Sequence, residues 1–386
     1  MLILIAPDSF KSSATAAEAA IALAAGAHRV LPDADVALYP MADGGEGTIA
    51  ALTTSGAVRV AEVAVTDAIG RPRTARYGMD SVGTAIIEVA EASGLPHVAG
   101  HLAPLTASTW GTGLVIADAL AHGAREILLC LGGSATTDGG AGILRALGAR
   151  ALGANGEVDD GGAALAHIGQ IDLAGLLPAA RLARWRLACD VDNPLTGENG
   201  AAAVFGPQKG AGPADVAKLD AALGHWARLL NRDVGPLDEA SPGVGAAGGT
   251  PAALIAAFDA ELVPGARLVA DAIGLTARIP EADLLITGEG SFDSQSLDGK
   301  VVGTLAQLAS GAGVPVLVVA GAAKAGRETA ARAGIVGARS IADGPRALAE
   351  LMAKPAPLIE AAAADMLATF AAGLAAQGPE LGRPGL

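Results

Sequence analysis

The stretch Asp283–Ala320, DLLITGEGSFDSQSLDGKVVGTLAQLASGAGVPVLVVA, decides the predicted fold class. The apolar run 283–287 predicts a strand, and the Gly/Ser/Asp-rich residues 288–299 predict a loop. Residues 300–309 have helical spacing, and the apolar run 314–320 predicts a second strand. Strands that alternate with helices in this way are typical of a parallel sheet covered by helices.

The same alternation continues after this stretch and is also present at the start of the chain. Residues 324–333 predict a helix and 338–341 a strand, whereas the chain begins with a predicted strand at 2–6, a helix at 13–30 and a strand at 36–39. Five strands that alternate with helices predict an α/β fold with a doubly wound parallel sheet, built from both ends of the chain.

The region between these two ends has a different pattern. Stretches such as 58–65 and 73–77 are rich in β-forming residues and are joined by short Gly/Pro/Asp turns, which favours antiparallel pairing. A chain of 386 residues is also longer than one hydrophobic core usually supports. We therefore expect residues 1–60 and 281–386 to form one domain, and residues 61–280 to form an inserted mixed α/β domain.

Composition excludes several classes of partner. The formal net charge is −14, which repels a nucleic-acid backbone or an anionic membrane. Apolar runs are shorter than the roughly 20 residues needed to span a bilayer, and the apolar start meets Pro7-Asp8 too soon for a signal peptide. Cys130 and Cys189 lie far apart in or beside apolar runs, so we expect free thiols. These features indicate a cytoplasmic protein with a small-molecule ligand.

The common nucleotide-binding signatures are absent from the sequence. Gly299-Lys300 is followed by Val and lacks the upstream glycine of a P-loop. Gly243–Gly248 matches G-x-G-x-x-G, but it follows Asp-Glu-Ala-Ser-Pro instead of a strand. This context argues against a dinucleotide-binding fold at that position.

Four loops rich in Gly, Asp and Ser each follow an apolar run directly: Ala6–Lys11, Met41–Thr48, Gly132–Gly140 and Thr287–Asp293. Loops at the carboxyl ends of strands are where α/β sheets bind ligands. Glycine backbone N–H groups and helix N-termini can bind an anion, whereas the carboxylates could hold Mg²⁺ or accept a substrate proton. That combination is what phosphoryl transfer requires.

Two further segments add polar side chains to this set. Residues 189–197 contain Asp190 and Asn193 after an apolar strand, and residues 205–211 contain Lys209. An anionic ligand needs local cations in so acidic a chain. The lysines next to these loops are Lys11, Lys209 and Lys300.

On these motifs the sequence resembles the bacterial glycerate kinase family, of the type that makes 2-phosphoglycerate from glycerate. The matching runs follow the family order from residue 1 to about residue 325. They are Ile5-Ala-Pro-Asp-Ser-Phe-Lys, Pro40-Met-Ala-Asp-Gly-Gly-Glu-Gly-Thr, Gly132-Gly-Ser-Ala-Thr, Asp138-Gly-Gly-Ala-Gly, Cys189-Asp-Val, Asn193-Pro-Leu, Phe205-Gly-Pro-Gln-Lys-Gly-Ala and Ile286-Thr-Gly-Glu-Gly.

The resemblance implies a flavodoxin-like domain from both termini, an inserted domain similar in shape to a restriction-endonuclease core, and an active site between the two. It also implies ATP with Mg²⁺ as cofactors, and phosphorylation of D-glycerate to 2-phospho-D-glycerate in organic acid catabolism. Two positions depart from the family pattern: Ser12 stands where the family has Gly, and Thr137 where it has Asn. Because Ser adopts a positive φ less readily than Gly, Ser12 disfavours a backbone contact to phosphate at this position.

The predicted site has catalytic, ligand-binding and metal-binding residues. Asp190 is the first choice for orienting or deprotonating the substrate hydroxyl, and the further catalytic candidates are Asp8, Lys11 and Asp43. Substrate and nucleotide are expected to contact Ser9, Gly44, Gly45, Glu46, Gly132, Gly133, Ser134, Thr136, Asn193, Lys209 and Lys300. The candidates for Mg²⁺, bound through water, are Asp138, Glu289 and Asp293.

Two other functions stay open at this point. A related kinase could act on a different small hydroxy acid or on the 3-hydroxyl of glycerate. A non-catalytic protein that senses a nucleotide or a carboxylate would also use such loops, but it would lack one of the carboxylates or lysines, and none is missing. The sequence also leaves open whether the protein is a homo-oligomer.

Overall fold

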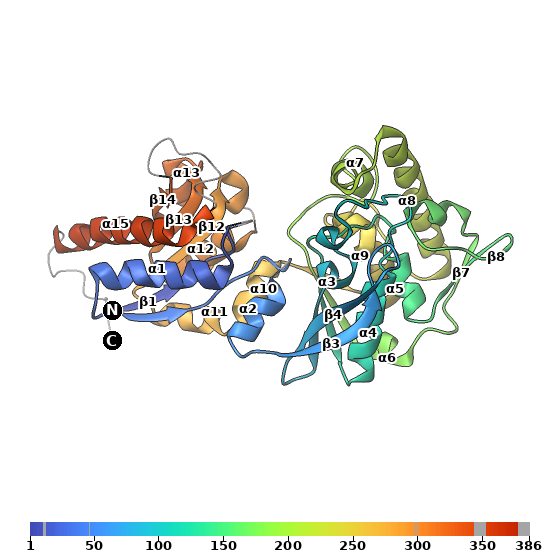
Figure 1. Ribbon diagram of the computed structural model, residues 1–386, viewed down its shortest axis with the longest axis horizontal. Coiled ribbons are helices and arrows are strands. Elements are labelled where there is room, and N and C mark those ends of the chain that lie inside the picture. Colours follow the sequence, from blue (N-terminus) through green and yellow to red (C-terminus); the bar gives the residue numbers. More distant parts are fainter. Residues whose placement is uncertain (11–12, 46, 298, 343–352, 377–386) are drawn as a thin grey trace. The chain divides into compact units, whose positions relative to one another are not determined.

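The computed structural model describes residues 1–386 except 11–12, 46, 298, 343–352 and 377–386. The chain divides into two compact units (Figure 1). The first consists of Met1–Asp43 and Val269–Leu386, and the second is Gly44–Leu268. We predicted boundaries after residues 60 and 280, so both divisions come earlier in the chain. The difference at the first boundary arises because helix α2 (Thr48–Thr54) packs on strands of the second unit.

The first unit contains a five-stranded sheet in the order β14-β13-β12-β1-β2. All neighbouring strands in it are parallel. Numbered along the chain, this order is 2-1-3-4-5, which is that of flavodoxin-like doubly wound sheets. The α/β fold class predicted from the sequence is therefore confirmed. The strands are β1 (Leu2–Ile5), β2 (Asp35–Leu38), β12 (Leu284–Phe292), β13 (Val316–Ala323) and β14 (Ile335–Ser340).

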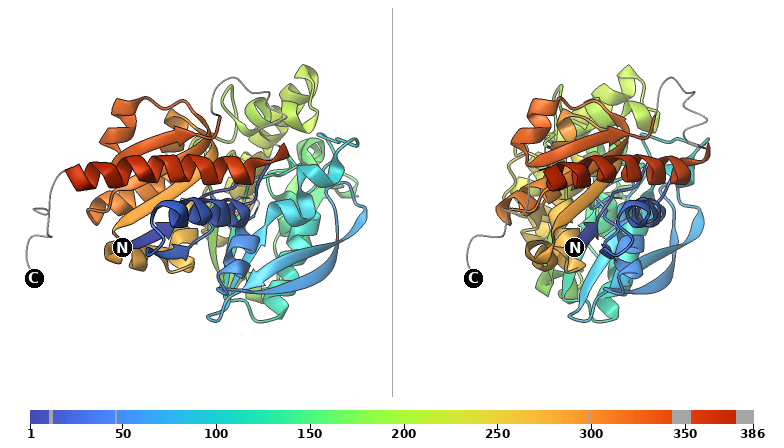
Figure 2. Two further views of the ribbon diagram at one scale, coloured as in Figure 1. Left: turned by 60° about the vertical axis from the view of Figure 1, so that its left-hand side comes forward. Right: turned by 90° about the vertical axis from the view of Figure 1, so that its left-hand side faces the viewer.

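Helices cover both faces of this sheet. On one face α1 (Ala16–Val30) and α15 (Pro355–Ala376) lie side by side (Figures 1 and 2), and the core under them includes Ile5 and Ile286. The alternate residues of the strands face the opposite way, where α12 (Val301–Gly311) packs on β12 and β13. The remaining helices of this part of the chain are α10 (Gly265–Ala272), α11 (Leu275–Arg278) and α13 (Arg327–Arg332).

Strand β12 is longer than the sequence predicted. Residues 288–292 were expected to form a loop, but they continue the strand and pair with β13 through Phe292 opposite Ala323. A Cβ atom at Gly288 would lie 2.2 Å from the carbonyl oxygen of Val319, so only glycine permits this close pairing. The predicted glycine-rich loop thus begins as an extended strand that projects beyond its neighbour β1.

The second unit is built on a six-stranded mixed sheet in the order β11-β10-β6-β5-β4-β3. The first four strands are parallel, and β3 and β4 add an antiparallel hairpin, as the β-rich sequence predicted. A small antiparallel sheet, β8-β7-β9, is separate. The strands are β3 (Arg59–Thr66), β4 (Pro72–Met79), β5 (Thr84–Glu88), β6 (Glu126–Cys130), β7 (Arg150–Gly153), β8 (Gly156–Glu157), β9 (Gln170–Asp172), β10 (Arg184–Ala188) and β11 (Glu261–Val263).

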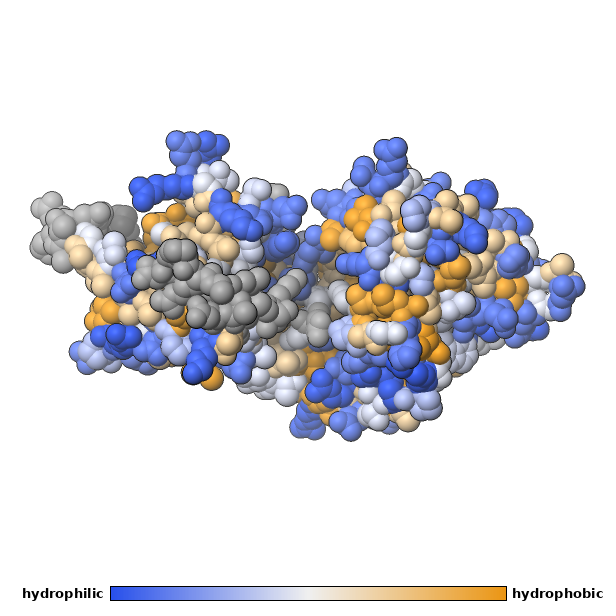
Figure 3. Space-filling model, turned by 45° about the horizontal axis from the view of Figure 1, so that its top comes forward, coloured by the Kyte–Doolittle hydropathy of each residue, from blue (hydrophilic) through white to orange (hydrophobic). Residues whose placement is uncertain are grey.

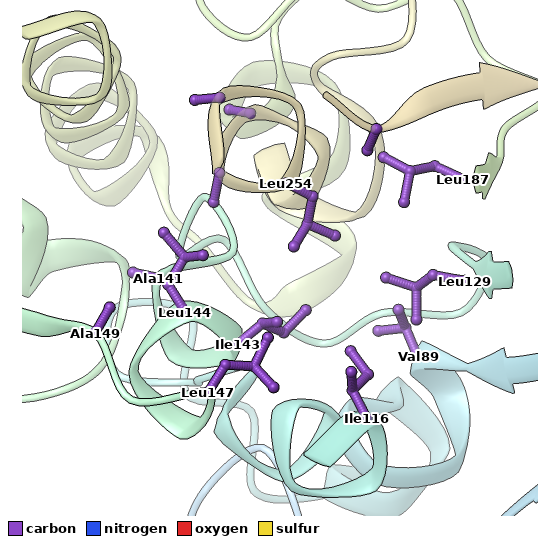
Figure 4. Close-up of a cluster of buried hydrophobic side chains, with 14 of the residues drawn as sticks. Val89, Ile116, Leu129, Ala141, Ile143, Leu144, Leu147, Ala149, Leu187 and Leu254 are labelled. Atoms are coloured by element: carbon purple, nitrogen blue, oxygen red, sulfur yellow. The ribbon is translucent and has the colours of Figure 1, made fainter. Parts of the chain in front are cut away.

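The core of the second unit is aliphatic, consistent with an apolar composition dominated by Ala, Val, Leu and Ile. Ile116 and Ile143 from two helices meet Leu129 and Leu187 from two neighbouring strands, with Leu254 from a third helix nearby (Figure 4). The helices are α3 (Val89–Ser93), α4 (Trp110–Ala121), α5 (Ala141–Ala146), α6 (Pro178–Leu182), α7 (Ala201–Phe205), α8 (Pro213–Asp233) and α9 (Ala246–Phe258).

The G-x-G-x-x-G match has no strand before it, as its sequence context predicted, because Gly243–Gly248 follows α8 and runs into the start of α9. Gly248 has a φ of +70°, and a Cβ atom there would lie 2.0 Å from the carbonyl oxygen of Thr136. These glycines therefore allow close packing against the loop after β6.

Among the described residues, no helix is both long and apolar enough to cross a membrane. Hydrophilic residues and small apolar groups are interspersed on the face drawn in Figure 3.

Candidate active site

The loops after β1 and β2 meet the extended end of β12 at the carboxyl edge of the first unit's sheet. The backbone N–H of Asp8 donates to the carbonyl oxygen of Gly288 (2.8 Å), and that of Met41 donates to the carbonyl oxygen of Pro7 (2.9 Å). The segments that carry the predicted residues Asp8, Asp43 and Glu289 are therefore neighbours within this unit. The backbone N–H of Ser9, another predicted residue, donates to the carboxylate of Asp8 (2.6 Å).

Two further predicted residues of the first unit lie in turns and caps. The carboxylate of Asp293 accepts the backbone N–H of Gln295 (3.0 Å), which closes the turn after β12. Lys300 immediately precedes α12, and its carbonyl oxygen accepts the first helical N–H, from Thr304 (2.9 Å). Lys11 and Glu46, which were also predicted, lie outside the described residues.

The second unit has its own carboxyl edge, where β5, β6 and β10 end side by side. Gly47 and the start of α2 are attached to this edge through Glu88, the last residue of β5. Glu88 is only 4% exposed, and its carboxylate accepts the backbone N–H of Ile49 (2.7 Å) and of Gly47 (3.3 Å). Sequence reasoning missed Glu88. The one available signal was a carboxylate directly after the apolar strand residues Ala85-Ile-Ile.

Gly44 packs tightly onto the same edge. Its φ is +81°, and a Cβ atom there would lie 2.6 Å from the Cβ of Ala188 and 2.7 Å from the Cα of Gly265. The backbone N–H of Gly265 in turn donates to the carboxylate of Asp190 (3.1 Å). The structure thus brings the predicted residues Gly44 and Asp190 to one place, although they are far apart in sequence.

The loop after β6, which contains Gly132–Thr136, lies beside them. It begins next to β10, because the backbone N–H of Leu131 donates to the carbonyl oxygen of Ala188 (3.4 Å). Two more backbone hydrogen bonds join this loop to α3 and the residues after it, from Ala135 to Ser93 and from Leu95 to Gly133 (both 2.8 Å). These hydrogen bonds anchor the predicted phosphate-binding segment to β10 and α3.

Lys209 reaches this loop from the turn after α7. Its Nζ donates to the Oγ of Ser134 (3.0 Å) and to the carbonyl oxygen of Thr136 (2.5 Å), and the residue is only 2% exposed. Burial lowers the pKa of Lys209 to about 7, and the negative charge of Asp138 only partly opposes this shift. Three predicted residues, Ser134, Thr136 and Lys209, are therefore in direct contact.

Asp138 is fully buried in a hydrogen-bond network of its own. Its carboxylate accepts the backbone N–H and the hydroxyl of Thr109 (both 2.8 Å) and the backbone N–H groups of Gly140 and Gly142 (both 3.3 Å). Burial raises the pKa of this carboxyl group. A metal ion would have to displace these donors, so the surroundings favour a structural role at the start of α5 over the predicted metal-binding role.

Asn193 is likewise used within its own loop. Its side-chain amide donates to the backbone carbonyl oxygen of Asn199 (2.8 Å), and its backbone carbonyl oxygen accepts the backbone N–H of Gly245 (2.9 Å). Asn193 therefore shapes the segment that follows Asp190. Within the described part of the chain, no group of three or more His, Cys, Asp and Glu residues is arranged to hold a metal ion.

Comparison with known proteins assigns the chain to a family. The sequence profile described as Glycerate kinase family matches residues 3–371. The chain is 43% identical to a glycerate kinase of Halalkalibacterium halodurans, over 94% of this chain and 96% of that protein. It is 45% identical to glycerate 2-kinase of Escherichia coli, over 83% and 85% of the two chains.

A solved structure gives the same result. A crystal structure from Salmonella typhimurium, provisionally named glycerate kinase 2, superposes with a TM-score of 0.85 at 41% identity, and the match covers 97% of this chain and 99% of that chain. The resemblance seen in the sequence motifs is confirmed. The chain therefore belongs to the glycerate kinase family and is a kinase.

Proposed function

We propose that the protein transfers the γ-phosphoryl group of ATP to the 2-hydroxyl of D-glycerate, giving 2-phospho-D-glycerate and ADP, as a step of organic acid catabolism. Family membership and the E. coli relative named glycerate 2-kinase support this proposal. The observation that carries it is the carboxyl edge of the second unit's sheet. A tightly packed glycine loop, the carboxylate of Asp190 and the buried Lys209 are gathered there, as phosphoryl transfer requires.

Asp190 orients the attacking hydroxyl and accepts its proton. The carboxylate is only partly buried, and one of its oxygens accepts the backbone N–H of Gly265, which fixes the orientation of the side chain. A carboxylate held in this way can accept a hydrogen bond from a substrate hydroxyl and take its proton as the bond to phosphorus forms. The leaving ADP oxygen needs no proton at neutral pH.

The donors of the second unit bind the anionic parts of the ligands. Lys209 and the loop Gly132–Thr136 supply an ammonium group, a hydroxyl and backbone amides close together. Groups held in advance by the fold stabilise developing charge without reorganising. Glu88 holds the backbone N–H groups of Gly47 and Ile49 in place at the same edge.

The nucleotide requires Mg²⁺, and the first unit has carboxylates suited to it. The segments that carry Asp8, Asp43 and Glu289 are neighbours at the ends of parallel strands, and Mg²⁺ in kinases uses only one or two protein carboxylates beside water and phosphate oxygens. Carboxylate oxygens are ligands that Mg²⁺ accepts, so these three residues are its candidates in this unit, whereas the carboxylate of Asp138 is already saturated by hydrogen bonds. Bound Mg²⁺ would neutralise charge on the phosphate oxygens.

The direct test is the reaction itself. The purified full chain is incubated with ATP, MgCl₂ and, separately, D-glycerate, L-glycerate and other small hydroxy acids, and the products are identified by ³¹P NMR. We expect 2-phosphoglycerate from D-glycerate. Formation of 3-phosphoglycerate, or a preference for another hydroxy acid, would replace the proposed acceptor, and the absence of any phosphorylated product would refute the proposal.

The role of Asp190 has a matched control two residues away. Asp190→Asn should lower kcat by about 10²- to 10⁴-fold, while Asp192→Asn, at an exposed position, should leave kcat nearly unchanged. Both variants are assayed by coupled ADP release and checked for folding by circular dichroism. Turnover of D190N close to that of D192N would exclude Asp190 as the base.

A further inference from the structure

The ammonium group of Lys209 has more hydrogen-bonding capacity than its surroundings use. An ammonium group has three N–H donors. In the described part of the chain, two of them have partners, namely the hydroxyl of Ser134 and the carbonyl oxygen of Thr136. The third donor is available for an oxygen atom that the described residues do not supply.

Both partners of Lys209 are uncharged. Within the described residues, no carboxylate lies within ion-pair distance of its Nζ. Asp138 is the charged group that acts on it electrostatically, but the carboxylate oxygens of Asp138 accept hydrogen bonds from Thr109, Gly140 and Gly142. Because a buried charge without a paired counter-charge is costly, the free protein disfavours the ammonium form.

Two hydroxyl groups of the loop that Lys209 contacts also lack partners among the described residues. The Oγ1 atoms of Thr136 and Thr137 are buried and have no hydrogen-bond partner within the described part of the chain. Buried polar groups in proteins are nearly always hydrogen-bonded, so such atoms call for an explanation. Their place in the predicted phosphate-binding loop is consistent with a ligand that brings additional oxygen atoms.

We propose that Lys209, Ser134 and Thr136 form an anion subsite, and that Lys209 takes up one proton from solvent when a carboxylate or phosphate oxygen of a ligand binds there. The inference rests on the proposed function, because D-glycerate and ATP are the sources of these two groups. The anion supplies the missing counter-charge, and the protonated amine then donates its third N–H to the anion. The lowered pKa of Lys209 agrees with a neutral amine in the free protein above pH 7.

Lys209 should differ from an ordinary surface lysine in the number of protons that ligand binding takes up. A solvated lysine is protonated both before and after a ligand binds, so the binding of the ligand changes its proton count by zero. With a pKa of about 7, about nine tenths of the Lys209 side chains are neutral at pH 8, so binding should take up about 0.9 proton per ligand at that pH. Near pH 7 the uptake should fall to about half a proton.

The experiment is isothermal titration calorimetry of the full chain with D-glycerate alone and with MgATP alone. Titrations at pH 8 in HEPES and in Tris, which differ in ionisation enthalpy, give the number of protons taken up, since both ligands are fully deprotonated at that pH. The variants are Lys209→Met, Ser134→Ala as a second change that keeps the lysine, and Lys218→Met as the control. Lys218 is an exposed lysine on α8.

We expect K209M to bind one of the two ligands about 10- to 100-fold more weakly at pH 6.5, the usual effect of losing a charge-assisted hydrogen bond, and to show no proton uptake at pH 8. S134A should weaken the same ligand about 3- to 10-fold, and K218M should match the wild type. An effect confined to D-glycerate assigns the subsite to the carboxylate, and one confined to MgATP assigns it to a phosphate.

Wild-type binding of both ligands without proton uptake at pH 8, or binding of both by K209M within twofold of the wild type, would overturn the inference. If K209M does not fold, the proton count of the wild type and the affinity of S134A decide the question. The binding measurements do not depend on turnover, so they can refute the inference while the ³¹P NMR assay still detects 2-phosphoglycerate. If the binding results are as expected but no phosphorylated product forms, the proposed function is refuted and the anion subsite stands.

Discussion

The buried lysine should make the stability of the second unit depend on pH in a characteristic way. Folding lowers the pKa of Lys209 from the ordinary lysine value of 10.5 to about 7, because the side chain is buried. One pKa unit corresponds to about 1.4 kcal/mol, so retaining the ammonium form costs the folded state on the order of 5 kcal/mol below pH 7. Lys209→Met removes this cost together with the hydrogen bonds to Ser134 and Thr136.

The direction of the effect follows from the number of bound protons. Below pH 7 the lysine is protonated in both the folded and the unfolded state, so it contributes no pH dependence there. Between pH 7 and about 10.5 the unfolded chain holds a proton that the folded chain lacks, and the free energy of unfolding therefore rises with pH. The wild type should gain about 1.4 kcal/mol per pH unit over this interval relative to K209M.

Urea unfolding followed by tryptophan fluorescence measures this difference selectively. The three tryptophans of the chain, Trp110, Trp185 and Trp226, all belong to the second unit. The free energies of unfolding of the wild type and of K209M are compared at pH 6.5, 7.5, 8.5 and 9.5, and Lys218→Met serves as the control. The contributions of the other titrating groups cancel in the difference between the two proteins. From pH 7.5 to 9.5 the difference should change by about 2.7 kcal/mol. A change below about 0.5 kcal/mol would show that Lys209 keeps its proton.

Three further predictions concern residues around the site. Glu88→Ala releases the backbone N–H of Gly47 and should lower kcat/KM by at least about tenfold. The variant E88Q should recover part of this loss, and equal kinetics of E88A and wild type would contradict the positioning role of Glu88. Trp226→Phe removes the indole N–H that donates to the carbonyl oxygen of Gly139 (3.0 Å), so urea unfolding should show a loss of about 2–4 kcal/mol; a loss below about 0.5 kcal/mol would mean that this hydrogen bond is replaced. Burial raises the pKa of Cys189 from 9.0 to about 11. Its alkylation by iodoacetamide at pH 8, measured by mass spectrometry, should therefore be about 100-fold slower than that of an unperturbed thiol. Alkylation at the ordinary rate would show that the thiol is not shielded.

The fold class was accessible from the sequence because its signals are local. Apolar runs of four to eight residues separated by helical spacing identify parallel strands without any knowledge of their order. The motif at Asp283–Ala320 predicted β12, α12 and β13 in the right sequence. Glycine-rich loops directly after strands also predicted which segments gather at the carboxyl edges of the sheets, since that consequence follows from parallel topology alone.

The extent of β12 and the place of α2 could not be predicted in this way. The residues from Gly288 to Phe292 are glycine-rich and polar, and they become a strand only because β13 extends beside them. Helix α2 follows β1 and β2 of the first unit in sequence, yet backbone amides at its N-terminus bind Glu88 of β5. Both features depend on neighbours that are distant along the chain.

The α/β class, the alternation of strands and helices, the family and the set of polar loops can be inferred from the sequence alone, because each is encoded by residues close together in the chain. What individual side chains can do depends on the three-dimensional fold. Lys209 has its unusual pKa because residues about 75 positions away bury it without supplying a carboxylate, and Asp138 is saturated by donors that include Thr109, 29 positions away. The physical reason is that burial, hydrogen bonding and electrostatic energies depend on distances in space, which no local pattern of residue types specifies.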